Sequence, residues 1–263
     1  MNKRRESKGG DLLRIAREVL RIEGEAVLAL IPRLGREFET AVEILYRCRG
    51  RIIVGGMGKA GIIARKVSAT LASTGSPSLS LHPVEALHGD LGIVSGDDAV
   101  IMISRSGESD EIKNLIPFIK RMGIPLIAIT GNLKSALAAH SDVTLDAAVE
   151  KEACPLNLAP TASTTAALAL GDALAVALIE QRGFEPADFA RLHPAGALGK
   201  SLLLKVSDLM RIKDANPVVG EETPVKDVIL RITAARAGAA SVVDGSGRLS
   251  GFFTDGDLRR HIE

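Results

Sequence analysis

The first fifty residues alternate apolar and polar positions with the spacing of a helix. Apolar residues recur every three or four positions over residues 11–30 and again over residues 38–45, before Gly50. A repeat of this kind places the apolar side chains on one face of an α-helix. We therefore expect two amphipathic helices at the start of the chain.

Beyond Gly50, short apolar runs alternate with longer stretches of helical pattern. The apolar runs cover residues 52–55, 78–81, 99–104, 125–130 and 143–145. The helical stretches cover residues 59–72, 108–122, 133–139 and 161–181. Buried strands that alternate with helices are typical of a parallel sheet covered on both faces. The pattern thus predicts an α/β fold with three αβα layers around a five-stranded parallel sheet.

The pattern changes after Gly199 and predicts a small α+β unit. Its expected elements cover residues 206–210, 224–235, 240–243 and 249–253, and it stops at Glu263 just after the start of another helix. About 55 residues is marginal for an independent domain, so its apolar face should need a second copy of the unit to cover it. No such copy is found in the sequence. Either the unit is cut short or a partner chain supplies the other half.

The composition agrees with this fold and excludes one class of function. The chain has 263 residues, of which 46% are hydrophobic but only 3% aromatic, so Ala, Val, Ile and Leu must build the core. A base-stacking nucleic-acid surface would need more aromatic residues. The formal charge is +1, and the first ten residues hold four basic and one acidic side chain, which leaves −2 for the rest. A broadly basic nucleic-acid binder is therefore excluded.

The two cysteines and the N-terminus indicate the cellular compartment of the protein. Cys48 and Cys154 are too few for a disulfide framework or a cysteine zinc site, which favours a reducing cytoplasm. We find no apolar run of roughly 18 residues that would span a membrane, and no signal-peptide core after the basic residues 1–10. The sequence therefore predicts a soluble cytoplasmic protein without a membrane partner.

The first expected strand ends in a glycine-rich loop. Residues 56–61 match the dinucleotide fingerprint, but the tip of the second strand, residues 80–82, lacks the acidic residue that would bind a ribose. Gly56 and Gly58 still allow the backbone to approach a ligand, and the helix that follows favours an anion. Lys59 could then pair with a phosphate or polarise a sugar oxygen, although it could also be an ordinary surface lysine.

Hydroxyl side chains gather at two further helix starts. Ser104, Ser106 and Ser109 lie in the turn between the third strand and its helix, where hydroxyls and backbone N–H groups suit a phosphate dianion. The simpler interpretation is that they only cap the helix. Thr161, Ser163, Thr164 and Thr165 open the long helix in the same way. They are expected to form a second edge of one anion site.

Several acid and base groups lie close to these loops. Glu111 is in the first turn after the serine turn, Glu152 follows the fifth strand, and His193 lies in an irregular loop over residues 192–199. Each could also be structural, for example as a carboxylate that stabilises a helix dipole. His82 and His88, together with nearby Asp90 or Glu85, could chelate a metal.

These motifs together resemble a known family. Residues 55–61, 82–90, 104–109, 151–155 and 193–199 are similar to the sugar isomerase (SIS) domain of bacterial D-arabinose 5-phosphate isomerases. The resemblance begins near residue 11. The tail, which ends with residues 253–260, looks like the first of the two cystathionine-β-synthase-type (CBS) repeats that these enzymes carry.

The resemblance implies a flavodoxin-like fold, a homotetramer, and no required metal or organic cofactor. It implies interconversion of D-ribulose 5-phosphate and D-arabinose 5-phosphate on the route to the sugar Kdo of lipopolysaccharide or capsule. By position, the family's active-site residues correspond to Lys59, Glu111, Glu152 and His193. The serine turn and residues 161–165 correspond to its phosphate-binding loops, and His82 and His88 to an inhibitory divalent-metal site. Arg105 is a departure, because relatives usually have Asn there.

The chemistry of this reaction suggests a role for each of these side chains. An isomerisation through an enediol needs a carbon base, proton shuttles and a group that stabilises the oxyanion. We expect Glu152 to be the carbon base with Glu111 as its competitor, Lys59 to stabilise the enediolate, and His193 to move hydroxyl protons, reaching a neighbouring subunit's site. The alternatives are a different phosphosugar isomerase and a sugar-phosphate sensor without turnover.

Three segments are expected along the chain. They are a flexible basic arm over residues 1–10, an SIS domain over residues 11–205, and a partial CBS module over residues 206–263 without a second repeat. If another chain completes that module, it could bind a nucleotide or sugar effector.

Overall fold

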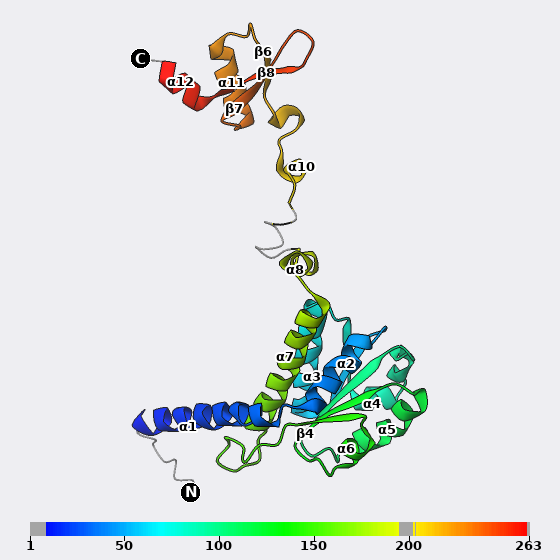
Figure 1. Cartoon of the computed structure of the whole chain (residues 1–263). Coiled ribbons are helices and arrows are strands. Elements are labelled where there is room, and N and C mark those ends of the chain that lie inside the picture. The colour runs from blue at the N-terminus through cyan, green and yellow to red at the C-terminus, as the bar shows by residue number, and fades with distance from the viewer. Residues whose placement is uncertain (1–8, 195–201, 203, 262–263) are drawn as a thin grey trace. The chain divides into compact units, whose positions relative to one another are not determined.

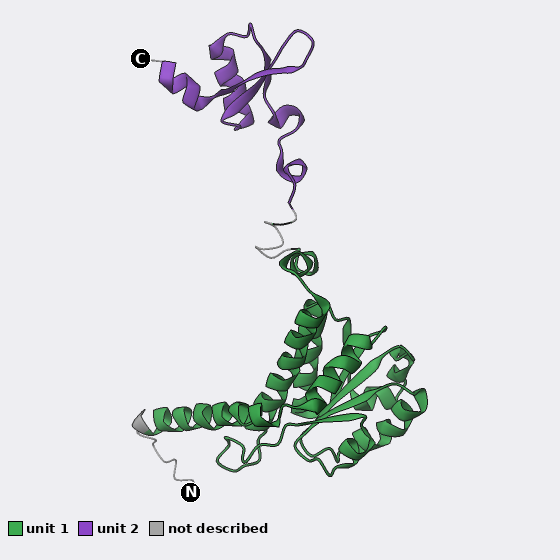
Figure 2. Ribbon diagram, viewed as in Figure 1, with its two compact units in different colours: residues 1–202 green, residues 203–263 purple. Residues whose placement is uncertain are grey.

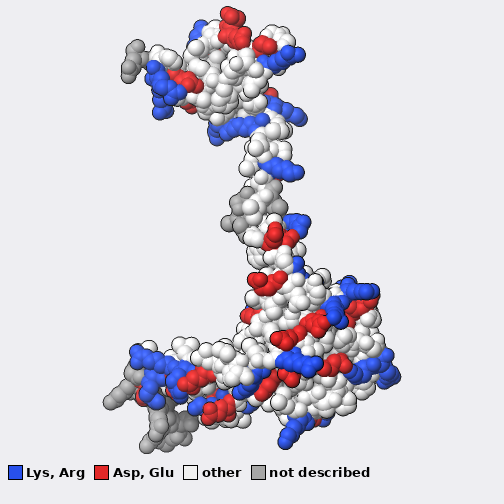
Figure 3. All heavy atoms as spheres, viewed as in Figure 1, with Lys and Arg blue, Asp and Glu red and all other residues white. Residues whose placement is uncertain are grey.

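The computed structural model describes residues 9–194, 202 and 204–261, and the chain divides into two compact units. The first covers residues 1–202 and the second residues 203–263 (Figure 2). On the face drawn in Figure 3, acidic and basic side chains are interspersed over both units. That mixture agrees with the nearly balanced charge of the chain.

The first unit is built on one parallel sheet. Its strand order is β2-β1-β3-β4-β5, and every neighbouring pair is parallel. The strands are β1 (Ile52–Gly56), β2 (Ser78–Leu81), β3 (Ala99–Ser104), β4 (Leu126–Thr130) and β5 (Val143–Asp146). The predicted three-layer α/β fold with five parallel strands is confirmed.

Two helical layers cover the sheet, because alternate strand residues point to opposite faces. One face packs under α2 (Arg36–Arg47), α3 (Gly58–Ser73) and α7 (Ala162–Arg182). The other packs under α4 (Pro83–Leu87), α5 (Asp110–Met122) and α6 (Ala136–His140). Helices α1 (Gly9–Leu28) and α8 (Pro186–Leu192) complete the unit, and α1 packs against α7 (Figure 1). The short helix α4 was not predicted, and α6 begins three residues later than expected.

Helix α7 corrects one expectation from the sequence. An 18-residue window within its 21 residues has a mean hydropathy of 1.7, so it is long and apolar enough to span a membrane, although no such run was expected. Half of that window is buried inside the structure. The helix packs against α3, α2 and α1. Its apolar residues are therefore accounted for by the core of the first unit.

Gly171 lets α7 approach α3 closely. A Cβ added there would lie 2.3 Å from Cγ2 and 2.9 Å from Cγ1 of Val67. We expect Gly171→Ala to lower the free energy of unfolding by about 1–2 kcal/mol, because overpacking outweighs the gain in helix propensity of up to about 1 kcal/mol. Urea unfolding measures the effect.

A matched substitution separates packing from propensity. Gly24 in α1 has no atom within 4 Å of an added Cβ, so Gly24→Ala should stabilise the protein slightly. In a Val67→Ala background, Gly171→Ala should also become stabilising. If Gly171→Ala stabilises the unaltered protein, the close approach of the two helices is not what requires glycine.

The second unit has a small three-stranded sheet of order β6-β7-β8. Strand β6 (Val218–Gly220) is parallel to β7 (Ala239–Val243), which is antiparallel to β8 (Leu249–Thr254). Its helices are α10 (Val206–Leu209), α11 (Val225–Ala235) and α12 (Asp255–His261). Among the described residues of this unit, four buried apolar side chains form the core: Val219, Val228, Ile232 and Ala240. The predicted small α+β module is present, and β6 is an addition to the expected elements.

Candidate active site

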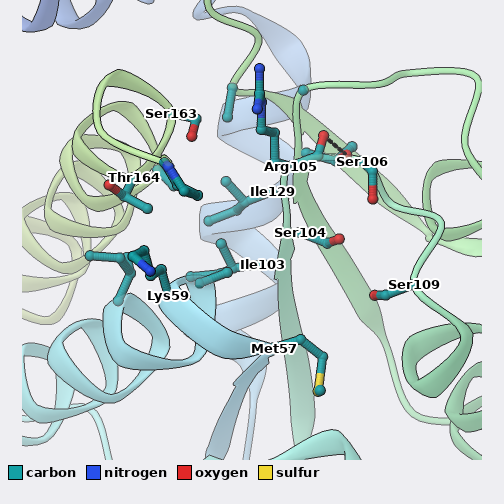
Figure 4. Close-up of a pocket in the computed structure, with 17 residues that line it drawn as sticks. Met57, Lys59, Ile103, Ser104, Arg105, Ser106, Ser109, Ile129, Ser163 and Thr164 are labelled. Atoms are coloured by element: carbon teal, nitrogen blue, oxygen red, sulfur yellow. Dashed lines mark hydrogen bonds between the residues drawn. The ribbon is translucent and has the colours of Figure 1, made fainter. Parts of the chain in front are cut away.

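A cavity of about 370 Å³ opens at the carboxyl ends of β1, β3 and β4 (Figure 4). Strands β1 and β3 are neighbours, but β1 leads into α3 on one face of the sheet and β3 into α5 on the other. This topological switch point is where open α/β sheets bind ligands. The fold therefore places the cavity where a substrate is expected.

The cavity brings together six of the residues predicted for the site. They are Lys59, Ser104, Ser106, Ser109, Ser163 and Thr164. Figure 4 shows two groups of hydroxyls, those of the serine turn on one side and those of α7 on the other, with Ile103 and Ile129 between them. The two hydroxyl-rich helix starts that the sequence singled out are thus two edges of one cavity.

Hydrogen bonds fix the serine turn. The Ser104 hydroxyl accepts a hydrogen bond from the Gly107 N–H at 3.0 Å, and the Ser106 hydroxyl accepts one from the Glu108 N–H at 3.3 Å. Gly107 has φ +65°, and a Cβ there would lie 2.1 Å from Oγ of Ser135. Glycine is therefore required at this position, both by the backbone conformation and by the close approach of α6.

Two hydroxyls on the cavity wall are unpaired within the described part of the chain. Oγ of Ser109 and Oγ of Ser163 are buried and make no hydrogen bond to any described residue. Buried polar atoms are nearly always paired, so an unpaired hydroxyl beside a cavity indicates a ligand with oxygen acceptors. The charged side chains of the described cavity lining are Lys59 and Arg105, both cationic. The cavity therefore suits an anion that carries hydroxyl or phosphate oxygens.

Glu152 lies behind this wall, at the start of α7. Its side chain is fully buried. Oε2 accepts hydrogen bonds from the Thr161 N–H at 2.8 Å, the Thr161 hydroxyl at 3.2 Å and the Ser163 N–H at 3.1 Å. Oε1 lies 3.3 Å from Nε of Arg105. Burial alone would raise the pKa of Glu152, but the contacts with Ser163 and Thr161 and the charge of Arg105 lower it.

Glu111 and His193 do not line this cavity. Glu111 is in the first turn of α5, as predicted. His193 follows α8, where its ring stacks on Phe189 at 3.9 Å between centroids and its Nδ1 lies 2.9 Å from the Phe189 carbonyl oxygen. The rest of the loop that carries His193, residues 195–199, lies outside the described residues. A single chain thus brings together only part of the predicted acid and base set.

Gly56 and Gly58 line a second cavity, of about 450 Å³, together with His82, Glu85 and Asp90. The serine turn lines the first cavity, together with Met57 and Lys59 of the glycine-rich loop. His88 is exposed and does not line the second cavity. Within the described ranges, no group of three or more His, Cys, Asp or Glu side chains could hold a metal ion.

Sequence reasoning missed part of the cavity wall. Thr130 and Gly131, at the end of β4, line it, and the Gly131 N–H donates to the Arg105 carbonyl oxygen at 3.0 Å. Arg105 was noted only as a departure from the family pattern. The sequence contains a signal for all three, because Thr130 is the last residue of a central parallel strand and Gly131 and Arg105 each follow such a strand directly.

Family comparisons match both parts of the chain. The SIS domain matches residues 44–177, and the CBS domain matches residues 206–263. Arabinose 5-phosphate isomerase KdsD of Pseudomonas aeruginosa is 49% identical over 257 residues, which cover 98% of this chain and 79% of that protein. The protein of the same name from Escherichia coli K12 is 50% identical over 252 residues, 96% of this chain and 77% of that one.

Solved structures match the first unit. A protein of Escherichia coli CFT073 in complex with arabinose 5-phosphate has a TM-score of 0.69 and 44% identity, covering 72% of this chain and 100% of that one. A putative sugar-phosphate isomerase of Listeria monocytogenes has a TM-score of 0.70 and 32% identity, with the same coverage. About half of the residues are identical to those of curated relatives of one name over nearly the whole chain, and an SIS domain is followed by a CBS domain. This chain therefore belongs to the arabinose 5-phosphate isomerase family.

Proposed function

We propose that this chain is an aldose–ketose isomerase that interconverts D-ribulose 5-phosphate and D-arabinose 5-phosphate. The observation that carries the proposal is the cationic cavity at the switch point, with two unpaired buried hydroxyls, in a chain about half identical to isomerases of that name. Neither of the alternatives, a different phosphosugar isomerase or a sensor without turnover, is favoured by these relatives. The product would supply the synthesis of Kdo.

The cavity suggests how the substrate lies. We place the phosphate against the serine turn, where the Ser109 hydroxyl has no other partner and α5 begins. The sugar then extends towards Lys59 and the hydroxyls of α7, Ser163 and Thr164. No cofactor is needed in this scheme, because carboxylate, imidazole and ammonium groups can move the protons of an enediol mechanism.

The roles that we propose for the side chains are those expected from the sequence. Lys59 stabilises the enediolate oxygen, and Glu152, which contacts Arg105 and Ser163 of the cavity wall, is the carbon base, with Glu111 as its competitor. His193 does not line the cavity of its own chain, and it moves hydroxyl protons in the site of a neighbouring copy. We propose in addition that the protein is a homotetramer and a soluble cytoplasmic enzyme. Its CBS module would bind a nucleotide or sugar effector when another chain completes it.

A substrate panel tests the proposed activity. Purified protein is expected to convert ribulose 5-phosphate to arabinose 5-phosphate, with kcat/KM at least about tenfold higher than for hexulose 6-phosphates, because pocket shape discriminates a lengthened substrate by that order. Product formation is followed by chromatography. Faster turnover of a six-carbon phosphate would make it a different isomerase, and phosphosugar binding without any turnover would make it a sensor.

A further inference from the structure

Arg105 stands between the cavity and Glu152. Its backbone is fixed where β3 ends, since its carbonyl oxygen accepts hydrogen bonds from the Gly131 N–H at 3.0 Å and the Thr130 hydroxyl at 3.4 Å. Its side chain is 48% exposed and lines the cavity between the serine turn and Ser163 (Figure 4). A guanidinium in this position can contact a ligand without any movement of the backbone.

The other neighbour of this guanidinium is a buried carboxylate oxygen, Oε1 of Glu152. Oε2 of Glu152 accepts three hydrogen bonds at the start of α7, whereas Oε1 accepts none from the residues that the structure describes. The cation that faces Oε1 is Nε of Arg105, at 3.3 Å. A buried carboxylate oxygen without a partner is costly, so this contact matters for the position and charge of Glu152.

The guanidinium has donors left for a ligand. Arginine carries five N–H groups in a planar fork, and the contact of Arg105 with Glu152 is made through Nε. In the described part of the chain, the Nη groups of Arg105 make no hydrogen bond. The same side chain can therefore reach a carboxylate with one edge and a phosphate with the other.

We propose that Arg105 is a positioning residue whose guanidinium is shared between Glu152 and the phosphate of the substrate. Phosphate binding then weakens the interaction between Arg105 and Glu152. The inference rests on the proposed function only for the identity of the phosphate ester. The phosphate dianion competes with Oε1 of Glu152 for the positive charge of the Arg105 guanidinium. Glu152 is then a weak base in the empty enzyme and a stronger one in the complex.

Other charged groups near Glu152 are few. Lys59 lies in the same cavity as Arg105, and Glu23 of α1 accepts a hydrogen bond from the Thr165 hydroxyl at 3.2 Å, one turn along α7 from Glu152's partners. Neither contacts the Glu152 carboxylate, whereas Arg105 does. Arg105 is therefore the charged side chain that acts on Glu152 directly, in addition to the larger effect of the hydrogen bonds from Ser163 and Thr161 on its pKa.

A double-mutant cycle on phosphate binding tests the sharing, with inorganic phosphate titrated calorimetrically into the full-length protein. Arg105→Gln should weaken phosphate binding by about tenfold or more, as expected for the loss of a charge-assisted hydrogen bond. Glu152→Gln should tighten it by about threefold or more, because the competing carboxylate has gone. In the Arg105→Gln background, that tightening should disappear.

Each result decides the proposal. If Glu152→Gln tightens phosphate binding equally in both backgrounds, or if Arg105→Gln leaves the affinity unchanged, the guanidinium is not shared and the proposal is wrong. Lys120→Gln is the control, because Lys120 forms a half-exposed pair with Asp142 at the amino end of the sheet, and it should leave the affinity unchanged. Thermal unfolding checks that each variant is folded, and Arg105→Lys, which keeps the charge without the fork, should restore binding only in part.

The pH dependence of kcat/KM is a further test, because it would not change if Arg105 had a purely structural role. Removing a cation beside a carboxylate raises its pKa, so the acid limb of kcat/KM should shift to higher pH in Arg105→Gln. The substrate's own phosphate titrates identically in both proteins. An unshifted limb would overturn the link to Glu152. The binding cycle does not depend on turnover, so its result is separable from any failure of the isomerase assignment.

Discussion

Glu152→Gln is expected to lower kcat by about 100- to 10 000-fold, the usual range for loss of a general base. The substitution keeps the size of the side chain and one acceptor for the N–H groups of Thr161 and Ser163, but removes the charge that would take a proton from carbon. Exchange of solvent deuterium into ribulose 5-phosphate should fall by the same factor, since it reports proton removal at carbon directly.

Glu111→Gln is the comparison that decides the assignment. Neither carboxylate lines the cavity, but Glu152 contacts Arg105 and Ser163 of its wall, whereas Glu111 lies in the first turn of α5. We therefore expect Glu111→Gln to retain most of the exchange. If Glu152→Gln exchanges deuterium at the parental rate while Glu111→Gln does not, the two roles must be reversed. Thermal unfolding should be measured for both variants. Glu152 also caps α7, so its substitution could lower activity by disturbing the start of that helix.

The sheet could be predicted because its central strands are buried on both faces. Every residue of β1, β3 and β4 is buried, so each strand appears in the sequence as an unbroken apolar run. The carboxyl ends of such strands meet at one edge of the sheet. The hydroxyls of residues 104–109 could therefore be assigned to a ligand site before the structure was known.

Features that depend on contacts between distant segments could not be predicted in this way. Helix α4 is a single turn of five residues, and β6 has three, so neither has a measurable period. Nothing in the sequence indicates that Glu152 accepts hydrogen bonds from the start of α7 or faces Arg105, because these contacts join segments from different loops. The sequence likewise does not indicate that Gly56 and Gly58 line a different cavity from the serine turn.

The second large effect is expected at Lys59, which lines the cavity from the start of α3. Lys59→Met should lower kcat by about 100- to 1 000-fold with little change in KM, because a group that stabilises the enediolate acts only when negative charge develops on the sugar oxygen. Steady-state kinetics with ribulose 5-phosphate measures both constants.

The division between kcat and KM separates the two roles left open for this lysine. If Lys59 instead holds the phosphate, which is equally charged in the ground state and the transition state, Lys59→Met should raise KM and leave kcat nearly unchanged. Lys66→Met is the matched control, because Lys66 lies on the same helix but pairs with Asp172 of α7 and does not line the cavity. Loss of that half-exposed pair should cost at most about 1 kcal/mol of stability and leave kcat within about twofold. A comparable fall in kcat for both variants would mean that the helix as a whole, and not the Lys59 ammonium, sets the rate.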